Sequence, residues 1–510
     1  MEQKNKKKIS TQTIIKLLLA VVLLGLSAFL LKGDVWTFWT WWLLAGVMGF
    51  AAMPVTGRLF WRFEDKGWIF SKVLAIAATG FLTWFLTAIR LIPFNALTCA
   101  AVTILCAVIC FFLLRKESKE KTECFPVDRI SLIYWEELLF FLAFLMWTYL
   151  AGFRPAAYGT EKFMDYGFME AMMRSNTLPA RDLWYSEGHI NYYYGGQYFA
   201  VFLTKLSHTK VELTYNLMRT FVAGLAFAMP FSLVYQMMSD RMKGLQKSEK
   251  VIKGLPFAAG FTAGTAVSIA GNMHYVIYAQ IIPLIEKLTG KEVSSYWFPD
   301  ATRYIGYNPY REEDRTIHEF PCYSFVLGDL HAHVVNIMFV LLVIALLYVW
   351  LRGVRKKTVP VETSMKDGKF WKEQLLMPHL LVISVLLGMF QWTNFWDFVI
   401  YYVVTLGTVL FVNIIRFQGK IKKIIVVTFA QMAEIYLIAY LVILPFTLQF
   451  DTMVDGIGIA KYHSYFYQLL VLWGLPTVLT ITFVITILWE KLRGMEHKSL
   501  YRLMKAIRTA

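Results

Sequence analysis

The chain has 510 residues, of which 57% are hydrophobic and 16% are aromatic, and its formal net charge is +16. A soluble protein cannot bury so much apolar surface, and apolar runs of about the ~20 residues that a bilayer requires recur along the chain. These runs are continuous and do not alternate with a period of two, which argues against a β-barrel. No soluble basic domain is evident, so the positive charge indicates membrane topology and does not indicate nucleic-acid binding.

The hydropathy pattern predicts an all-α, polytopic bundle of about twelve membrane-spanning helices. The first run, Ile14–Leu31, follows a lysine-rich start and lacks a small-residue cleavage site, so it is expected to be a retained span. The segment 192–207 is also apolar enough to cross a membrane. The predicted spans are 14–31, 35–53, 69–89, 96–114, 133–151, 213–238, 255–279, 333–351, 376–391, 398–415, 424–446 and 466–488.

The distribution of positive charges decides whether 192–207 crosses the membrane. If the N-terminus is cytoplasmic and 192–207 does not span, most of the 51 Lys and Arg residues lie on the cytoplasmic side. If it did span, the basic loop 239–254 and the basic C-terminal tail would face outward. We therefore expect 192–207 to be interfacial or re-entrant, with both termini cytoplasmic and two large outer loops, 152–212 and 280–332.

The chain is expected to comprise four N-terminal helices within residues 1–130, a main membrane domain over 131–490, and a basic tail over 491–510. It has five cysteines without the CxxC spacing of a metal site. Disulfides are therefore not expected to organise the fold.

The first outer loop contains two carboxylates four residues apart, Glu161 and Asp165. If this segment is helical, both side chains share one face. Acidic and aromatic residues crowd the rest of the loop, a combination that suits a sugar site. Carboxylates bind or deprotonate hydroxyls, and aromatic rings stack on sugar faces. The alternative is a solvated loop with an ordinary acidic face.

The second outer loop ends in the sequence Asp329-Leu-His331-Ala-His333, and Glu319 lies ten residues before it. In an extended strand the three side chains would point the same way and could bind a metal. In a helix only Asp329 and His333 would share a face. Substrate contact and a helix N-cap at Asp329 are the alternatives.

Three other polar groups stand out. Arg303, together with the arginines at 311 and 315, could bind a phosphate or pair with the neighbouring acids at 312–314. Trp396 and Asp397 lie between two spans on the outer side. They could bind the substrate, or they could simply form part of an aromatic belt and a helix cap. Glu434 lies within a predicted span, and it is either functional or a hydrogen-bonding group of the bundle.

Several of these motifs, in this order, resemble the YYY family of membrane proteins, also called domain of unknown function 2298. They are EKFMD (Glu161–Asp165), the Asp-x-Trp of Asp182–Trp184, INYYYGG (Ile190–Gly196), EFPCYSFVLGDLHAHV (Glu319–Val334) and TNFWDF (Thr393–Phe398). The resemblance begins at about Trp135. The family pattern has paired prolines and Asp-Pro-Trp, where this chain has Pro179-Ala180 and Asp182-Leu183-Trp184.

The resemblance implies a fold and an activity, because this family is grouped with the GT-C glycosyltransferases. These enzymes transfer sugar from a polyprenyl-phosphate donor at the outer membrane face. An acid of the first outer loop is their catalytic base, which here implies Asp165 or Glu161, with Asp165 favoured. The resemblance also implies a GT-C-type bundle whose outer loops carry helices along the membrane surface.

The expected function is inverting glycosyl transfer at the outer face of a prokaryotic cytoplasmic membrane. The expected partners are the bilayer, a lipid-linked sugar and an acceptor glycan, lipid or protein, and no nucleic acid. No cofactor is certain, and a divalent metal at Asp329, His331 and His333 is an alternative. A transporter or flippase of lipid-linked sugars is the alternative function. The expected substrate-binding residues are Asp182, Trp184, His189, Asn191, Tyr192, Tyr193, Tyr194, Arg303, Glu319, Asp329, His331, His333, Trp396 and Asp397.

Overall fold

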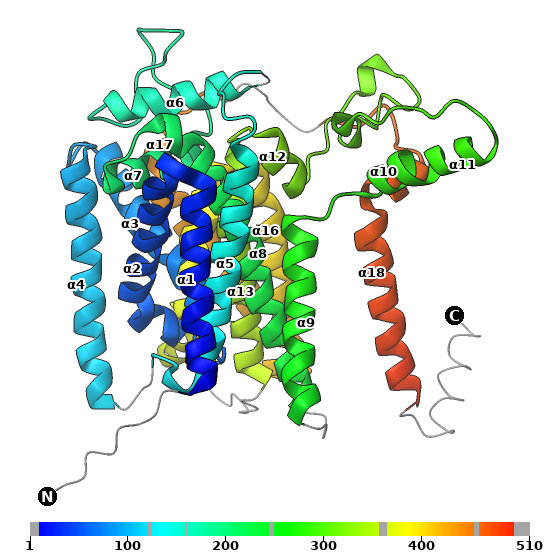
Figure 1. Cartoon of the computed structure of the whole chain (residues 1–510). Helices are drawn as coiled ribbons and strands as arrows, with labels where there is room; N and C mark the ends of the chain where they lie inside the picture. The colour runs from blue at the N-terminus through cyan, green and yellow to red at the C-terminus, as the bar shows by residue number, and fades with distance from the viewer. Residues whose placement is uncertain are drawn as a thin grey trace, which may run out of the picture. The chain divides into compact units, whose positions relative to one another are not determined.

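The computed structural model describes residues 10–120, 124–159, 161–243, 249–355, 365–452 and 458–493, and the regular elements in these ranges are helical (Figure 1). The α-helices are α1 (Thr11–Leu31), α2 (Val35–Leu59), α3 (Trp68–Ala88), α4 (Ala96–Glu120), α5 (Ile130–Ala151), α6 (Lys162–Arg174), α7 (Gly195–Ser207), α8 (Val211–Met242), α9 (Glu249–Ser268), α10 (Met273–Tyr275), α11 (Ile282–Leu288), α12 (Pro321–Leu327), α13 (Ala332–Arg355), α14 (Gly368–Gln374), α15 (Pro378–Thr393), α16 (Phe395–Phe417), α17 (Ile421–Thr447) and α18 (Phe466–Arg493). The prediction of an all-helical bundle is confirmed.

The chain is a multi-pass integral membrane protein. In the described residues, nine helical stretches are long and apolar enough to cross a membrane, or up to eleven if each of two bent helix pairs forms one span. The sequence pattern predicted about twelve membrane-spanning helices. The difference arises because Thr11–Leu59, which holds α1 and α2, counts as a single stretch. The two bent pairs involve α9 with α10–α11, and α14 with α15.

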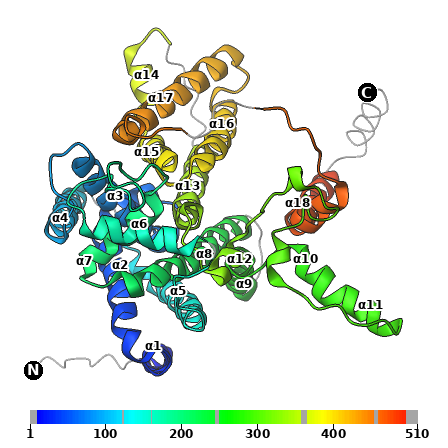
Figure 2. The ribbon, with the colours of Figure 1, turned by 90° about the horizontal axis from the view of Figure 1, so that it is seen from above.

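The chain divides into two compact units, and most of the helices belong to the first. Unit 1 comprises Met1–Ile269 and Ser324–Met453, and unit 2 comprises Ala270–Tyr323 and Val454–Ala510. Within unit 1, α8 and α3 are the most buried of the spanning helices, whereas α4 is largely exposed. Seen from above, α6 and α7 lie over the ends of the upright helices of this unit (Figure 2).

Helix α7 shows why the segment 192–207 does not cross the membrane. It has 13 residues, which corresponds to about 20 Å at ~1.5 Å per residue, whereas the hydrocarbon core of a bilayer is ~30 Å thick. Every residue from Gly195 to Lys205 is buried. The segment is therefore covered by protein, as irregular or short elements at this depth must be, and it is not an exposed surface helix.

The tyrosine triplet ends in a buried aromatic cluster. Tyr194 is 2% exposed, and its hydroxyl accepts a hydrogen bond from Trp84 Nε1 at 3.0 Å. The Trp84 and Trp392 rings stack with centroids 4.3 Å apart, and Tyr194 meets Trp392 edge-on at 5.7 Å. Tyr194, one of the expected substrate-binding residues, is therefore buried in the core of unit 1.

Gly195 and Gly196 allow α7 to pack closely against other helices. A Cβ at Gly195 would lie 2.7 Å from the Thr393 side chain, and one at Gly196 would lie 3.1 Å from Ala332 Cα. Both residues are helical. The pair therefore brings α7 next to α13 and α15.

Glu434 makes a structural hydrogen bond. Its Oε1 accepts the backbone N–H of Leu376 at 2.8 Å, at the junction between α14 and α15. Nearby, Gln431 Nε2 donates to the carbonyl of Gln374 at 2.8 Å, and Asn413 Nδ2 donates to Gln431 Oε1 at 2.8 Å. These contacts fit the reading of Glu434 as a hydrogen-bonding group of the bundle. None of the five cysteines forms a disulfide in the described residues.

Unit 2 contains α10, α11 and α18 with the irregular segments around them. The predicted span 255–279 is interrupted, because α9 ends at Ser268 and Asn272 caps a new helix by accepting the N–H of His274 at 3.1 Å. Tyrosines gather in this unit. The Tyr278 and Tyr304 hydroxyls are 2.7 Å apart, and Tyr467 donates to the carbonyl of Asn308 at 2.8 Å.

Candidate functional site

The two acids of the first predicted outer loop lie together at the start of α6. Glu161 directly precedes the helix, and the backbone N–H of Asp165 donates to the Glu161 carbonyl at 3.2 Å. This first turn sets the spacing that was expected from the sequence. The two environments differ, since the Asp165 side chain is 1% exposed and that of Glu161 is 62% exposed.

The second predicted outer loop brings His331 to the same place. His331 Nδ1 lies 3.2 Å from Asp165 Oδ2. Its Nε2 lies 3.7 Å from Asp329 Oδ2 and 3.9 Å from Glu161 Oε2. We call Glu161, Asp165, Asp329 and His331 the carboxylate–histidine cluster. Three carboxylates thus surround one imidazole that keeps 18% of its side chain exposed.

Gln197 of α7 fastens the two halves of this cluster to each other. Its side chain is fully buried, and its Nε2 donates to Asp165 Oδ1 at 2.7 Å and to the Leu330 carbonyl at 3.0 Å. One amide therefore fixes the carboxylate of α6 and the loop that carries His331. Buried polar contacts of this kind hold a rigid geometry because each is costly to break.

Two cations border the cluster at Gly328. This residue has a φ of +99°, which favours glycine, and a Cβ there would lie 2.7 Å from Arg219 Nη1 and 3.0 Å from Lys162 Nζ. Arg219 Nη1 donates to the Phe325 carbonyl at 2.7 Å, and Nη2 donates to Asn216 Oδ1 at 3.0 Å. Positive and negative side chains therefore lie on adjacent sides of one loop.

The electrostatics of the surrounding residues reflect this arrangement. Burial and the neighbouring Arg219 lower the pKa of Lys162, while Asp329 opposes that shift. Burial, followed by the carboxylates of Glu161 and Asp165, raises the pKa of Tyr192. Tyr192 therefore keeps its phenolic proton and can act as a neutral hydrogen-bond donor beside the cluster.

Three further candidates form the loop that follows α6. Asp182 Oδ1 accepts the backbone N–H groups of Trp184 at 2.7 Å and of Tyr185 at 2.9 Å, so this carboxylate stabilises a turn. His189 pairs with Arg181 in an isolated antiparallel bridge. Trp184 is 59% exposed, and its ring meets those of Phe163 and Phe168 edge-on. Trp184 thus lies beside α6 with an accessible ring.

Asn191 and Tyr193 contact the segment after α17. Asn191 Nδ2 donates to the Asp451 carbonyl, and the Asp451 N–H donates back to Asn191 Oδ1, both at 2.9 Å. The Tyr193 ring packs on Phe450 with centroids 5.4 Å apart. These two residues therefore fasten the tyrosine motif to another part of unit 1.

Asp397 joins two helices. Its Oδ2 accepts from Asn336 Nδ2 at 2.6 Å, and Asn336 Oδ1 accepts from the Thr393 hydroxyl at 2.8 Å. The Asn336 side chain thus connects α13 with the junction between α15 and α16. Trp396, in contrast, is 69% exposed, which suits the expected aromatic belt.

The remaining candidates lie in unit 2. Arg303 lies over the Trp297 ring at 5.6 Å, and Glu319 belongs to the same unit. Of the other two arginines, Arg315 pairs with Glu312 at 3.9 Å, and both 311 and 315 contact tyrosine rings. The arginines of this loop are therefore partly paired with neighbouring acids, as one of the two readings expected, and they also have aromatic partners.

The metal reading of the Asp329, His331 and His333 motif finds no support. Within the ranges that the structure describes, no group of three or more His, Cys, Asp and Glu side chains is arranged to hold a metal ion. α13 begins at Ala332, so the motif is extended only up to His331. The His331 and His333 rings are tilted by 42° with centroids 5.5 Å apart.

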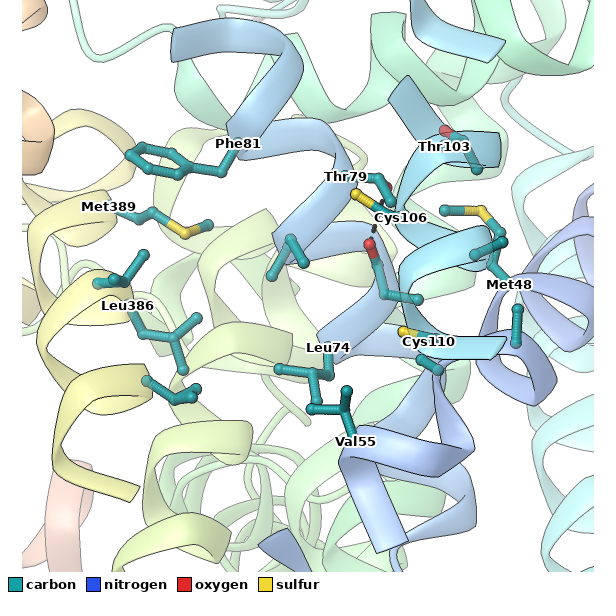
Figure 3. Close-up of a pocket in the computed structure, with 18 of the residues that line it drawn as sticks. Met48, Val55, Leu74, Thr79, Phe81, Thr103, Cys106, Cys110, Leu386 and Met389 are labelled. Carbon is teal, nitrogen blue, oxygen red and sulfur yellow. Dashed lines mark hydrogen bonds between the residues drawn. The ribbon is translucent and has the colours of Figure 1, made fainter. Parts of the chain in front are cut away.

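Unit 1 also contains an apolar cavity of about 350 Å³ between α2, α3, α4 and α15 (Figure 3). Phe81 and Met389 line one part of it, and Val55 and Leu74 line another (Figure 3). The Phe81 ring also packs on Trp84 at 5.5 Å. The aromatic cluster that contains Tyr194, Trp84 and Trp392 therefore adjoins the wall of the cavity.

Sequence reasoning missed four residues that shape the site: Lys162, Gln197, Tyr215 and Arg219. Arg219 carried a usable signal, because it is an ionisable residue inside the predicted span 213–238. Gln197 is the amide that directly follows the YYYGG motif. Tyr215 receives the Leu330 N–H at 3.4 Å, and nothing in the sequence indicates this long-range contact.

Comparisons with known proteins place the chain in a family without naming an activity. No match was found among curated proteins or among solved structures. A family model does match, and the matched region begins at residue 78, within α3, and thus well before the Trp135 at which the resemblance was expected to begin. The chain therefore belongs to the family described as uncharacterized membrane protein (DUF2298), whose model covers residues 78–510.

Proposed function

We propose that this protein is a membrane glycosyltransferase that takes a sugar from a polyprenyl-phosphate donor and transfers it, with inversion, to an acceptor hydroxyl. The observation that carries the proposal is the buried Asp165 carboxylate, 3.2 Å from His331, with Lys162 and Arg219 both adjoining Gly328 of the same loop. A base and a pair of cations so close together suit a reaction that removes a proton and releases a phosphate.

Asp165 and His331 would form the base together. The Asp165 side chain is 1% exposed, so an acceptor hydroxyl reaches His331 more easily than Asp165 itself. In this mechanism His331 Nε2 takes the proton from the hydroxyl, and Asp165 holds the ring through Nδ1 and stabilises the imidazolium. The acceptor oxygen forms the new bond to the anomeric carbon. The bond from that carbon to the phosphate oxygen breaks, and the phosphate leaves with the electron pair.

Lys162 and Arg219 would stabilise the departing phosphate. Positive groups fixed in place before the reaction stabilise charge that develops in the transition state, and they act more strongly away from bulk water. Lys162 is 8% exposed and Arg219 is 2% exposed. The raised pKa of Tyr192 supports a further role for that residue as a neutral donor to sugar or phosphate oxygens.

The cavity between α2, α3, α4 and α15 supports a lipid-linked donor. Its volume of about 350 Å³ lies in the range of ligand sites, and its lining is almost wholly apolar. In this proposal it would hold part of the isoprenoid chain. The α6 end of unit 1 would face outward from a prokaryotic cytoplasmic membrane, with both termini cytoplasmic. The acceptor would be a glycan, a lipid or a protein.

The direct test is sugar transfer by the purified protein in lipid nanodiscs. We expect radiolabelled sugar to be released from a polyprenyl-phosphate donor, faster for a long-chain donor than for a soluble short-chain analogue. The comparison separates use of the lipid chain from recognition of the phosphate alone. Intact donor after incubation with a panel of donors and membrane acceptors would contradict the proposal.

A substitution at Lys162 tests the phosphate contact. We expect Lys162→Gln to slow transfer by about 10- to 100-fold, since a hydrogen bond to a charged group contributes ~1.5–3 kcal/mol. The matched control is Lys210→Gln, because Lys210 directly precedes α8 and is exposed. Initial rates over a range of donor concentrations are the measurement. Equal rates for Lys162→Gln and the wild type would exclude this lysine from the site.

A further inference from the structure

A second group of buried ionisable side chains lies at the end of unit 1 opposite α6, near the connection between α2 and α3 (Figure 1). Lys72 and Glu136 are 0% exposed and Asp65 is 2% exposed. None of them contacts the carboxylate–histidine cluster in the hydrogen bonds and ion pairs of the described residues. The proposed transfer reaction therefore gives them no role.

The charge of Lys72 is neutralised by Glu137, the residue that directly follows Glu136. Lys72 Nζ lies 2.6 Å from Glu137 Oε1. Glu137 also accepts from Trp68 Nε1 at 2.6 Å and from Trp42 Nε1 at 3.2 Å. The buried cation therefore has its counter-charge in Glu137, and within the ranges that the structure describes no ion pair joins a cation to Glu136.

Two basic residues at this end of unit 1, Lys243 and Arg129, pair with Glu64. Glu64 Oε1 lies 2.8 Å from Lys243 Nζ, and Glu64 Oε2 lies 3.5 Å from Arg129 Nη1. The Glu64 backbone N–H donates to Gln236 Oε1 at 2.8 Å. Both cations are about half exposed and pair with Glu64, so they do not compensate a charge on Glu136.

Asp65 is built to hold a negative charge. Its Oδ1 accepts the N–H of Gly67 at 3.2 Å, and its Oδ2 accepts the N–H of Trp68 at 2.9 Å and the hydroxyl of Ser232 at 3.3 Å. Burial raises the pKa of Asp65, and these backbone donors oppose the shift. Three donors directed at one carboxylate favour its ionised form.

Glu136 has the opposite surroundings. Its carboxyl group adjoins only the side chains of Asp65 and Ser232 as polar neighbours, and among the described residues no backbone N–H donates to it. An ionised Glu136 would place a second negative charge beside Asp65 inside the bundle, where the adjoining Ser232 hydroxyl already donates to Asp65 Oδ2 at 3.3 Å. A buried, unpaired charge of this kind is costly enough that the group takes up a proton instead.

We infer that Glu136 and Asp65 form a proton-binding site in the membrane-spanning bundle, in which Glu136 carries the proton and Asp65 carries the charge. The ligand is the proton itself. A metal ion would need several oxygens directed at one point, and the described residues hold no such group. The inference does not depend on the proposed transferase activity, and it places a titratable site at the far end of unit 1 from the cluster.

The test is infrared spectroscopy of the full chain in lipid at neutral pH, with the wild type compared with Glu136→Gln. We expect the difference spectrum to contain the carbonyl band of a protonated carboxylic acid that is lost with Glu136. A carboxylate band in its place would overturn the inference.

Thermal unfolding of two adjacent variants gives an independent readout. Glutamine has the shape of a protonated glutamic acid, so Glu136→Gln should unfold at the same temperature as the wild type. Glu137→Gln, the matched control one residue away, leaves Lys72 buried without its partner and should unfold at a clearly lower temperature. A Glu136→Gln variant as unstable as Glu137→Gln would also overturn the inference, since it would mean that the Glu136 charge is needed.

Discussion

Asp165→Asn is expected to reduce sugar transfer by about 100- to 10,000-fold, the range that a general base contributes. In the wild type, Asp165 Oδ1 accepts from Gln197 and Oδ2 faces His331 Nδ1 at 3.2 Å. Asparagine keeps one oxygen for Gln197 but turns an N–H₂ group toward His331. The ring can then no longer present a hydrogen on Nδ1 to an acceptor, and its Nε2 loses the lone pair that takes the proton.

The rate of transfer at saturating donor concentration is the measurement for Asp165→Asn. Glu170→Gln is the matched control, because Glu170 lies on the same helix and pairs with Arg174, away from the cluster. We expect this control to retain wild-type activity. A smaller loss is expected for Glu161→Gln, since Glu161 is exposed and 3.9 Å from His331. Undiminished transfer by Asp165→Asn would remove the Asp165–His331 pair from the base role.

Gly260→Val is expected to destabilise the bundle more than any change at the surface. Gly260 and Gly264 of α9 lie one turn apart and face α8. A Cβ at Gly260 would lie 2.6 Å from the Phe231 carbonyl oxygen, and one at Gly264 would lie 2.7 Å from the Phe227 carbonyl oxygen. Backbone oxygens cannot move aside as side chains do. We expect a loss of about 1–3 kcal/mol in the free energy of unfolding, as overpacking causes in cores.

Thermal unfolding in detergent, followed with a dye that reacts with exposed thiols, measures this loss, because the Cys99 thiol is buried in the folded chain and becomes exposed on unfolding. Gly254→Val is the matched control on the same helix, since a Cβ at Gly254 meets nothing within 4 Å. The control should unfold at the wild-type temperature. If Gly260→Val does so too, close contact between α8 and α9 does not stabilise the bundle.

The sequence by itself determined the class of the molecule, because apolar runs of span length have few alternatives to membrane helices. It also singled out Glu161, Asp165, Asp329 and His331 through their spacing and their polarity in an apolar chain. The helical spacing of Glu161 and Asp165 is a local property, which is why it could be read from i,i+4 positions. Only the family comparison extended the recognised region to residue 78.

Tertiary structure alone decided which of the marked residues meet. Asp165 and His331 are far apart in sequence, and the contact between them depends on how α7 packs, with Gln197 holding both sides. The same packing buried Tyr194 against Trp84 and Trp392, so that one tyrosine of the triplet belongs to the core while Tyr192 remains beside the carboxylates. Hydropathy and charge patterns describe each segment separately. They contain no information on which distant side chain completes a hydrogen bond, because that depends on the packing of the whole bundle.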